Sequence, residues 1–234
     1  SLLRAKNASI PIAYYIYKNN LASDIIKTTY DGEDKKNIAK WLSMSLLKGL
    51  FGGQSDTILK TMREVISKSN TGKFPIQDII DAFKGEVDKN YTFDDDVINS
   101  FMEEVYGSPA CGLILILLYP DVVLEHGTAI AEDHMHPKTV FEDPKKFASL
   151  GFDEKVAEFC KANYNTVLNL QLLEESKNKS KGDDPLIKWA IENQKNENDL
   201  LVDAGISLDI KDFESFIKNR KKNIINLLKK ILAI

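Results

Sequence analysis

The sequence has little cysteine and no long apolar run, and both absences narrow the class of protein. Cys111 and Cys160 are the only two cysteines, and neither belongs to a C-x-x-C pair or another zinc-ligand spacing. We therefore expect two buried, reduced thiols in a cytoplasmic protein. The longest apolar run, Leu113 to Tyr119, is far below the roughly 20 residues that a membrane span needs. It is predicted to be a core segment, and no membrane partner is expected.

The chain also lacks a basic leader followed by an apolar stretch, so no signal peptide is predicted. It begins with Ser1 rather than Met, and we expect a fragment of a longer polypeptide. No Lys-Ser/Thr follows Gly52 and Gly53, so a phosphate loop is not predicted. The formal net charge of -4 argues against non-specific attraction of the whole surface to nucleic acid, although a local basic patch stays open.

Residues 1–121 read as a helical region. The chain has 43% hydrophobic and 28% charged residues, as a soluble globular protein does. Apolar residues recur at helical spacing in several stretches. These stretches are 9–20, 34–53, 55–69, 76–86 and 92–107. Ser9, Ser55 and Asp94 or Asp95 are the expected N-caps.

The residue pattern changes from helical spacing to strand-like stretches at about Asp121. β-branched residues interrupted by Gly127 predict a strand or hairpin up to Pro137, and residues 165–175 form a second strand-like stretch. A short helix is expected between them, over 153–162, and a polar helical segment follows. The predicted order within 122–195 is strand, excursion, strand, helix.

Residues 196–234 are predicted to be a C-terminal helical segment that packs on the rest. From Asp209 onward the tail is amphipathic and holds seven Lys/Arg against three Asp/Glu. The favoured interpretation is that these charges lie on a solvated helix face. The alternatives are contact with a DNA backbone and contact with a partner helix.

The stretch "AIAEDHMHPKTVF" holds two of the three histidines, His134 and His136, beside Asp133. It is either a polar turn or part of a metal-dependent site. Cutting a phosphodiester needs a base to deprotonate water and a divalent cation to neutralise charge. An imidazole suits the first role, and carboxylate and amide oxygens suit Mg²⁺ or Mn²⁺. On a strict strand Asp133 and His134 point to opposite faces, so convergence needs a bend at the strand end.

Farther along, Asn178 and Lys181 are three residues apart, so on a helix they share a face. One amide oxygen and one ammonium could then meet the same phosphate.

These residues carry a resemblance. "EDHMHPKTVF" followed by "NTVLNLQLLEESKNKSKGDDP" resembles the HNH, or His-Me finger, nucleases with their ββα-metal core. The resemblance implies that His134 is the general base, that Asp133 and Asn178 bind the metal, and that Lys181 faces the phosphate. It makes Asn169 a structural residue that holds the loop.

Two departures accompany the likeness. Many HNH proteins have an apolar residue where this chain has His136, which leaves a metal or phosphate contact and a hydrogen-bonded surface residue both open. The paired cysteines that bind structural zinc in some HNH proteins are absent. His126 is expected to be a polar loop residue.

A wider likeness covers nearly the whole chain. Residues 10–20 ("IPIAYYIYKNN"), 48–66 ("KGLFGGQSDTILKTMREVI") and the "DHMHP" core resemble the C-terminal part of GmrSD-type bacterial proteins. Those proteins join a ParB-like nucleotide-hydrolysing domain to an HNH nuclease and restrict foreign, often modified, DNA. The ParB-like domain would be a missing N-terminal part of the same polypeptide, so no nucleotide cofactor is expected here.

The sequence thus predicts a mainly α-helical protein with an embedded ββα-metal core. The expected activity is a Mg²⁺- or Mn²⁺-dependent DNA endonuclease of a restriction or phage-defence protein. The alternative is a helical interaction or regulatory module with a non-catalytic HNH-like core.

Overall fold

The computed structural model describes residues 5–27, 29–53, 55–127 and 129–232. The first half of the chain is helical, as expected, with short 3-10 turns η1 (Lys6–Ala8) and η2 (Phe101–Glu103). Its α-helices are α1 (Ser9–Lys18), α2 (Gly32–Leu47), α3 (Asp56–Lys68), α4 (Ile76–Ala82), α5 (Asp95–Ser100), α6 (Pro109–Leu118) and α7 (Pro120–His126).

The second half contains two strands, β1 (Ile130–His134) and β2 (Leu170–Glu174), which pair antiparallel along their whole length. Helices and 3-10 turns make up the rest. They are α8 (Lys138–Glu142), α9 (Pro144–Ser149), α10 (Glu154–Asn163), η3 (Val167–Asn169), α11 (Glu175–Lys181), α12 (Leu186–Glu192), α13 (Glu197–Leu200), η4 (Ile210–Asp212) and α14 (Phe213–Leu232). The described part of the chain is therefore mainly helical with a small two-stranded sheet, and the predicted order of strand, excursion, strand and helix is confirmed.

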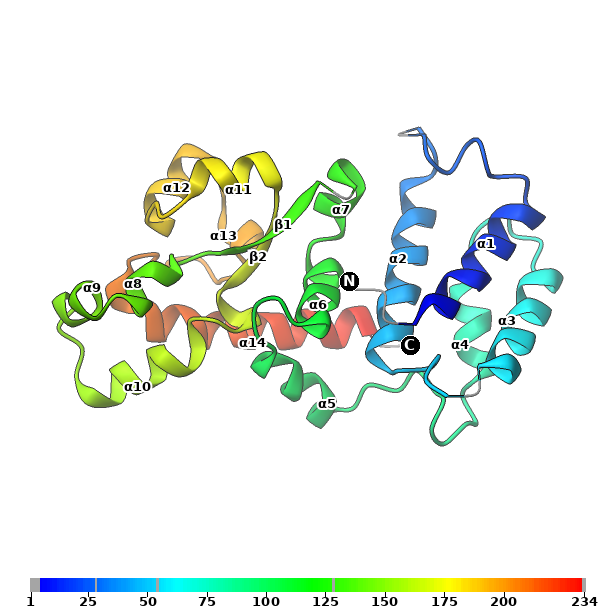
Figure 1. Ribbon diagram of the computed structural model, residues 1–234, viewed down its shortest axis with the longest axis horizontal. Coiled ribbons are helices and arrows are strands. Elements are labelled where there is room, and N and C mark those ends of the chain that lie inside the picture. Colours follow the sequence, from blue (N-terminus) through cyan, green and yellow to red (C-terminus); the bar gives the residue numbers. More distant parts are fainter. Residues whose placement is uncertain (1–4, 28, 54, 128, 233–234) are drawn as a thin grey trace.

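The long α14 and the apolar α6 hold the two halves together. Figure 1 shows α14 running beneath the sheet toward α2, and it packs against α5, α6, α10 and η3. The predicted apolar stripe of the tail is buried at Phe213, Phe216, Ile217, Ile224, Leu228 and Leu232. α6 also contacts β2, so the sheet rests on the core of the helical half.

The predicted core segment is confirmed, because α6 is buried over most of its length. Cys111 on α6 and Cys160 on α10 are free and buried, as expected. Within the described ranges, no single helix is long and apolar enough to cross a membrane.

Three local expectations were wrong. The stretch before β1 is not a strand, because Pro120 occupies the first turn of α7, where its missing N–H costs no hydrogen bond, and His126 ends this helix. Residues 167–169 form a 3-10 turn, so β2 begins only at Leu170. Ser9 does not cap α1, since its hydroxyl donates backward to the carbonyl of Lys6.

Two other predicted caps differ in how they work. The Asp94 side chain accepts from the backbone N–H of Val97 and caps α5, as expected. Ser55 stands at the N-cap position of α3 but makes no side-chain capping bond. Its hydroxyl accepts instead from the side-chain amide of Asn7, which ties the start of α3 to η1.

The basic segment of α14 is not uniformly exposed. Arg220 is completely buried, and its guanidinium donates to backbone carbonyls of Val167, Leu168, Leu170 and Leu200 and to the hydroxyl of Tyr119. For this side chain neither the favoured interpretation of a solvated face nor the alternative of DNA contact is correct. A buried cation needs such a full set of acceptors, because its desolvation is otherwise costly.

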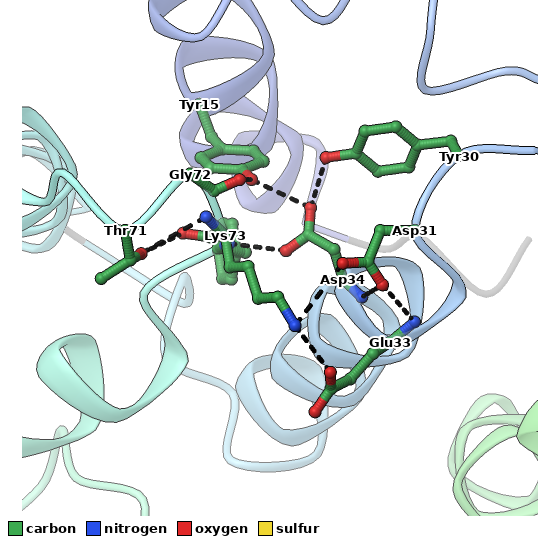
Figure 2. A network of polar contacts seen from close by, with 9 residues as sticks. Tyr15, Tyr30, Asp31, Glu33, Asp34, Thr71, Gly72 and Lys73 are labelled. Carbon is green, nitrogen blue, oxygen red and sulfur yellow. Dashed lines mark hydrogen bonds and ion pairs between the residues drawn. The ribbon is translucent and has the colours of Figure 1, made fainter.

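A buried carboxylate organises the other end of the molecule (Figure 2). Asp34, near the start of α2, is 0% exposed and accepts from the hydroxyls of Tyr15 and Tyr30 at 2.9 and 2.7 Å and from the amide of Phe74. Burial and these contacts raise the pKa of Tyr15 above its usual range. The network joins α1, α2 and the segment before α4.

Replacing Arg220 with Met should destabilise the protein by at least about 3 kcal/mol, because several buried carbonyls lose their donor. For a chain of this size that corresponds to a fall in Tm of about 6–12 °C, measurable by calorimetry. Lys221→Met is the matched control, since Lys221 is exposed on the same helix. Equal melting temperatures of the two variants would contradict the role given to Arg220.

Asp34→Asn should also destabilise the fold, because an amide offers one acceptor oxygen where three donors converge. We expect a loss of about 2 kcal/mol in the free energy of unfolding, measured in urea. The neighbouring exposed Glu33→Gln loses only a surface ion pair with Lys73 and should change the same quantity by less than about 1 kcal/mol. A loss no larger in Asp34→Asn than in Glu33→Gln would refute the assignment.

Candidate active site

The paired strands place the predicted site residues next to one another. Asp133 lies opposite Gln171 and His134 opposite Leu170, and α11 starts directly after β2. α11 packs against both strands, so its side chains meet the end of β1. Two stretches far apart in the sequence, β1 and the continuous segment of β2 and α11, therefore come together.

Asp133 is held by two side chains on one face of β1. Its carboxylate accepts from the Gln171 amide at 2.8 Å, and both of its oxygens lie 3.1 Å from Nζ of Lys181. The Asp133 side chain is only 5% exposed. Burial raises the pKa of this carboxyl, while the Lys181 ammonium and the Gln171 amide oppose the rise.

Lys181 does not lie where the sequence analysis expected it. A phosphate-facing Lys needs an accessible ammonium, whereas this side chain is 0% exposed. Its Nζ also donates to the backbone carbonyl of His134 at 2.5 Å and lies over the ring of Trp189. Lys181 is thus a buried cation that ties α11 to the end of β1, because the nearest anion is the carboxylate of Asp133.

His134 is surrounded by different residues from Asp133. Its Nε2 lies 2.9 Å from Oδ1 of Asn165, and its ring packs on Tyr106 with the centroids 4.8 Å apart. Burial lowers the pKa of His134, and the contact with Asn165 and the charge of Asp133 oppose the shift. The two neighbouring side chains therefore do not share their partners, as alternation along a strand requires.

Asn169 holds the turns at the ends of the strands together. Its Oδ1 accepts from the backbone N–H of His136, and its Nδ2 donates to the carbonyls of His136 and Tyr164 at 2.9 and 2.8 Å. Its own carbonyl accepts from the backbone N–H of Met135. These contacts are those of a residue that fixes a loop.

His136 is not the surface residue that the sequence analysis allowed. It is 1% exposed and packs edge-on against the rings of Phe213 and Phe216 of α14. Burial, and to a lesser extent the charge of Lys181, lowers its pKa to about 3. The imidazole is therefore neutral at physiological pH and belongs to the contact between β1 and α14.

Asn178 lies one helical turn before Lys181 on α11 and is partly exposed. Because residues three apart share a helix face, Asn178 is on the same face of α11 as Lys181, whose Nζ contacts Asp133 of β1. The described residues contain no group of three or more His, Cys, Asp or Glu that could hold a metal ion. Any ion at this edge would then depend on Asp133, Asn178 and ligands from outside the chain.

Tyr106, Asn165 and Gln171 contact the predicted site residues but were not predicted from the sequence. Gln171 could have been found from the register, since the residue opposite Asp133 on a paired strand must be close to it. Asn165 is the first residue of the predicted second strand-like stretch, but no spacing rule connects it with His134. Tyr106 comes from the helical half and carries no sequence signal.

Comparison with known proteins adds no relative. No protein-family model matches the chain, and no curated protein matches its sequence.

His136 should make stability depend on pH. Its folded-state pKa of about 3 lies below the usual value of 6.5, so its contribution is complete above pH 6.5 and is lost as the pH falls toward 3. As the pH falls from 6 to 4, the free energy of unfolding should fall less steeply in His136→Leu than in the wild type. The difference between the two slopes should be up to about 1.4 kcal/mol per pH unit. Urea titrations at several pH values measure both slopes, and parallel slopes would contradict the burial of a neutral imidazole.

Proposed function

We propose that the chain is a metal-dependent DNA endonuclease that hydrolyses phosphodiester bonds through an HNH-type ββα core. One observation supports this most directly: α11 packs against β1 and β2, and Lys181, one helical turn after Asn178, places its Nζ 3.1 Å from the carboxylate of Asp133. The HNH resemblance implies a helix beside the end of the first strand, and this packing is what supports the proposal.

In this proposal His134 is the base. Its neutral imidazole would take a proton from the water that attacks the phosphorus. The lowered pKa of His134 keeps the ring unprotonated at neutral pH, which a base requires. Tyr106 and Asn165 restrict the movement of the ring.

The donor set fits a hard divalent ion in kind. A carboxylate offers about four acceptor positions, so the contacts of Asp133 with Gln171 and Lys181 leave room for one more ligand. Asn178 would add an amide oxygen, and Mg²⁺ commonly takes its remaining ligands from water and substrate phosphate. When bound, Mg²⁺ or Mn²⁺ would neutralise charge on the scissile phosphate and the leaving oxygen.

Lys181 has a positioning role in this scheme rather than a phosphate-facing one. Its ammonium holds the carboxylate of Asp133 and the carbonyl of His134 together, which fixes the end of β1. The side chain is too deeply buried to contact a phosphate itself.

The biological setting proposed is that of the GmrSD-like resemblance. The chain would be the nuclease part of a cytoplasmic restriction or phage-defence protein, joined to a ParB-like domain that lies N-terminal to it. Its substrate would be foreign DNA, which the GmrSD-type proteins restrict in often modified form.

His134→Ala should reduce metal-dependent cleavage of supercoiled plasmid by roughly 10²-fold or more, because the base is lost. Asn178→Ala should shift the Mg²⁺ or Mn²⁺ titration to higher concentration. His126→Ala, at the end of α7 on a different element, is the matched histidine control and should cut as the wild type does. Full activity of His134→Ala on modified and unmodified plasmid would exclude this histidine from the mechanism.

A second function is favoured by one specific contact. The Lys181 ammonium already neutralises the carboxylate of Asp133, so a divalent cation bound there would be repelled by Lys181. Weak metal binding at Asp133 is what a regulatory module with a non-catalytic HNH-like core would show. Calorimetry with Mn²⁺ separates the two functions. Heat of binding that disappears in Asp133→Asn supports the nuclease, and no heat in the wild type supports the regulatory module.

A further inference from the structure

The His134 ring makes a contact that distinguishes its two nitrogens. Nε2 lies 2.9 Å from Oδ1 of Asn165. An amide oxygen can only accept a hydrogen bond, so Nε2 must carry the proton when the imidazole is neutral. The lone pair of the neutral ring is then on Nδ1, which is the nitrogen able to take a proton from another group.

Asn165 is itself fixed by the helical half of the chain. Its backbone carbonyl accepts from the N–H of Tyr106 at 2.9 Å, and Val105 and Thr166 form an isolated antiparallel bridge. The N–H of Val167 donates to the carbonyl of Glu104. Residues 104–106 and 165–167 therefore lie alongside each other as a short ladder, and the Asn165 backbone cannot shift without breaking it.

The same ladder places a second wall against the imidazole. Tyr106 belongs to it, and the Tyr106 ring packs on His134 with an angle of 37° between the two planes. Tyr106 thus binds the backbone of Asn165 through its N–H and packs its ring on the imidazole of His134. The Asn165 amide and the Tyr106 ring together restrict both the tilt and the tautomer of His134.

We infer that Asn165 is the positioning residue of His134, and that its amide oxygen fixes the tautomer with the proton on Nε2 and the reactive lone pair on Nδ1. The use of that lone pair in catalysis rests on the proposed nuclease function, whereas the tautomer itself does not.

The test is ring nitrogen-15 NMR of the full chain at about pH 8, well above the usual imidazole pKa of about 6.5. The three histidines are assigned with His126→Ala and His134→Ala. In the wild type, His134 should show a protonated, pyrrole-type Nε2 and an unprotonated, pyridine-type Nδ1. A pyridine-type Nε2 would overturn the inference without recourse to any variant.

Two variants sharpen the result. Asn165→Asp keeps an acceptor and should preserve the wild-type pattern, whereas Asn165→Leu should move both shifts toward the averaged values of a free imidazole. An unchanged pattern in Asn165→Leu would show that the contact does not set the tautomer. Asn99→Leu is the matched control, since the Asn99 side chain bonds only a carbonyl of its own helix.

Plasmid cleavage provides a separate readout. Asn165→Leu should lower it by about 10- to 100-fold, the usual cost of removing a partner that orients a functional histidine, and Asn165→Asp should restore most of it. If the wild type cuts no DNA, the nuclease proposal fails, while the nitrogen-15 pattern still decides the role of Asn165.

Discussion

The position of the small sheet depends on one buried guanidinium. Arg220 binds the carbonyls of Val167, Leu168 and Leu170, which lie on both sides of Asn169. It also binds Tyr119, the residue between α6 and α7. A two-stranded sheet is marginally stable by itself, so β2 needs this external support. Loss of the guanidinium would release the turn from which Asn169 holds the ends of both strands.

Beyond this anchor, the site is built from two separate polar groups. One joins Asp133, Gln171 and Lys181 inside the protein, and the other joins His134 to Asn165 beside Tyr106. Lys181 connects them, because it binds the carboxylate of the first and the backbone carbonyl of the second. The first group pairs the buried charges of Asp133 and Lys181, and the second orients the imidazole of His134. Both groups lie where the helical half meets the strands.

Much of the fold follows from local patterns. Helical spacing predicted α1 to α5, and the apolar stripe of the tail predicted which side of α14 is buried. The β-branched residues before Gly127 predicted a strand, but Pro120 starts the helix α7 there. Packing overrides strand propensity at this position. The basic residues around position 220 were predicted to lie on an exposed helix face, which is wrong for Arg220. The sequence shows that a residue is charged but does not show whether backbone carbonyls surround it in the fold.

The candidate site was predictable only in part. The Asp133–His134 pair and the Asn178–Lys181 spacing were visible as motifs, but burial of Lys181 depends on Trp189 and Asp133 arriving from other elements. His136 shows the same limit, because the rings that bury it lie on α14. Contacts between residues so far apart follow from tertiary packing, which no local pattern encodes.

The ladder between residues 104–106 and 165–167 has a consequence for how the protein opens. It attaches the segment just before β2 to the helical half, while Arg220 attaches the next residues to the C-terminal helix. Neither attachment breaks without disturbing a separate part of the core. The pair of strands β1 and β2 is therefore not an independent opening unit, and its amides should exchange with solvent only through cooperative, near-global unfolding.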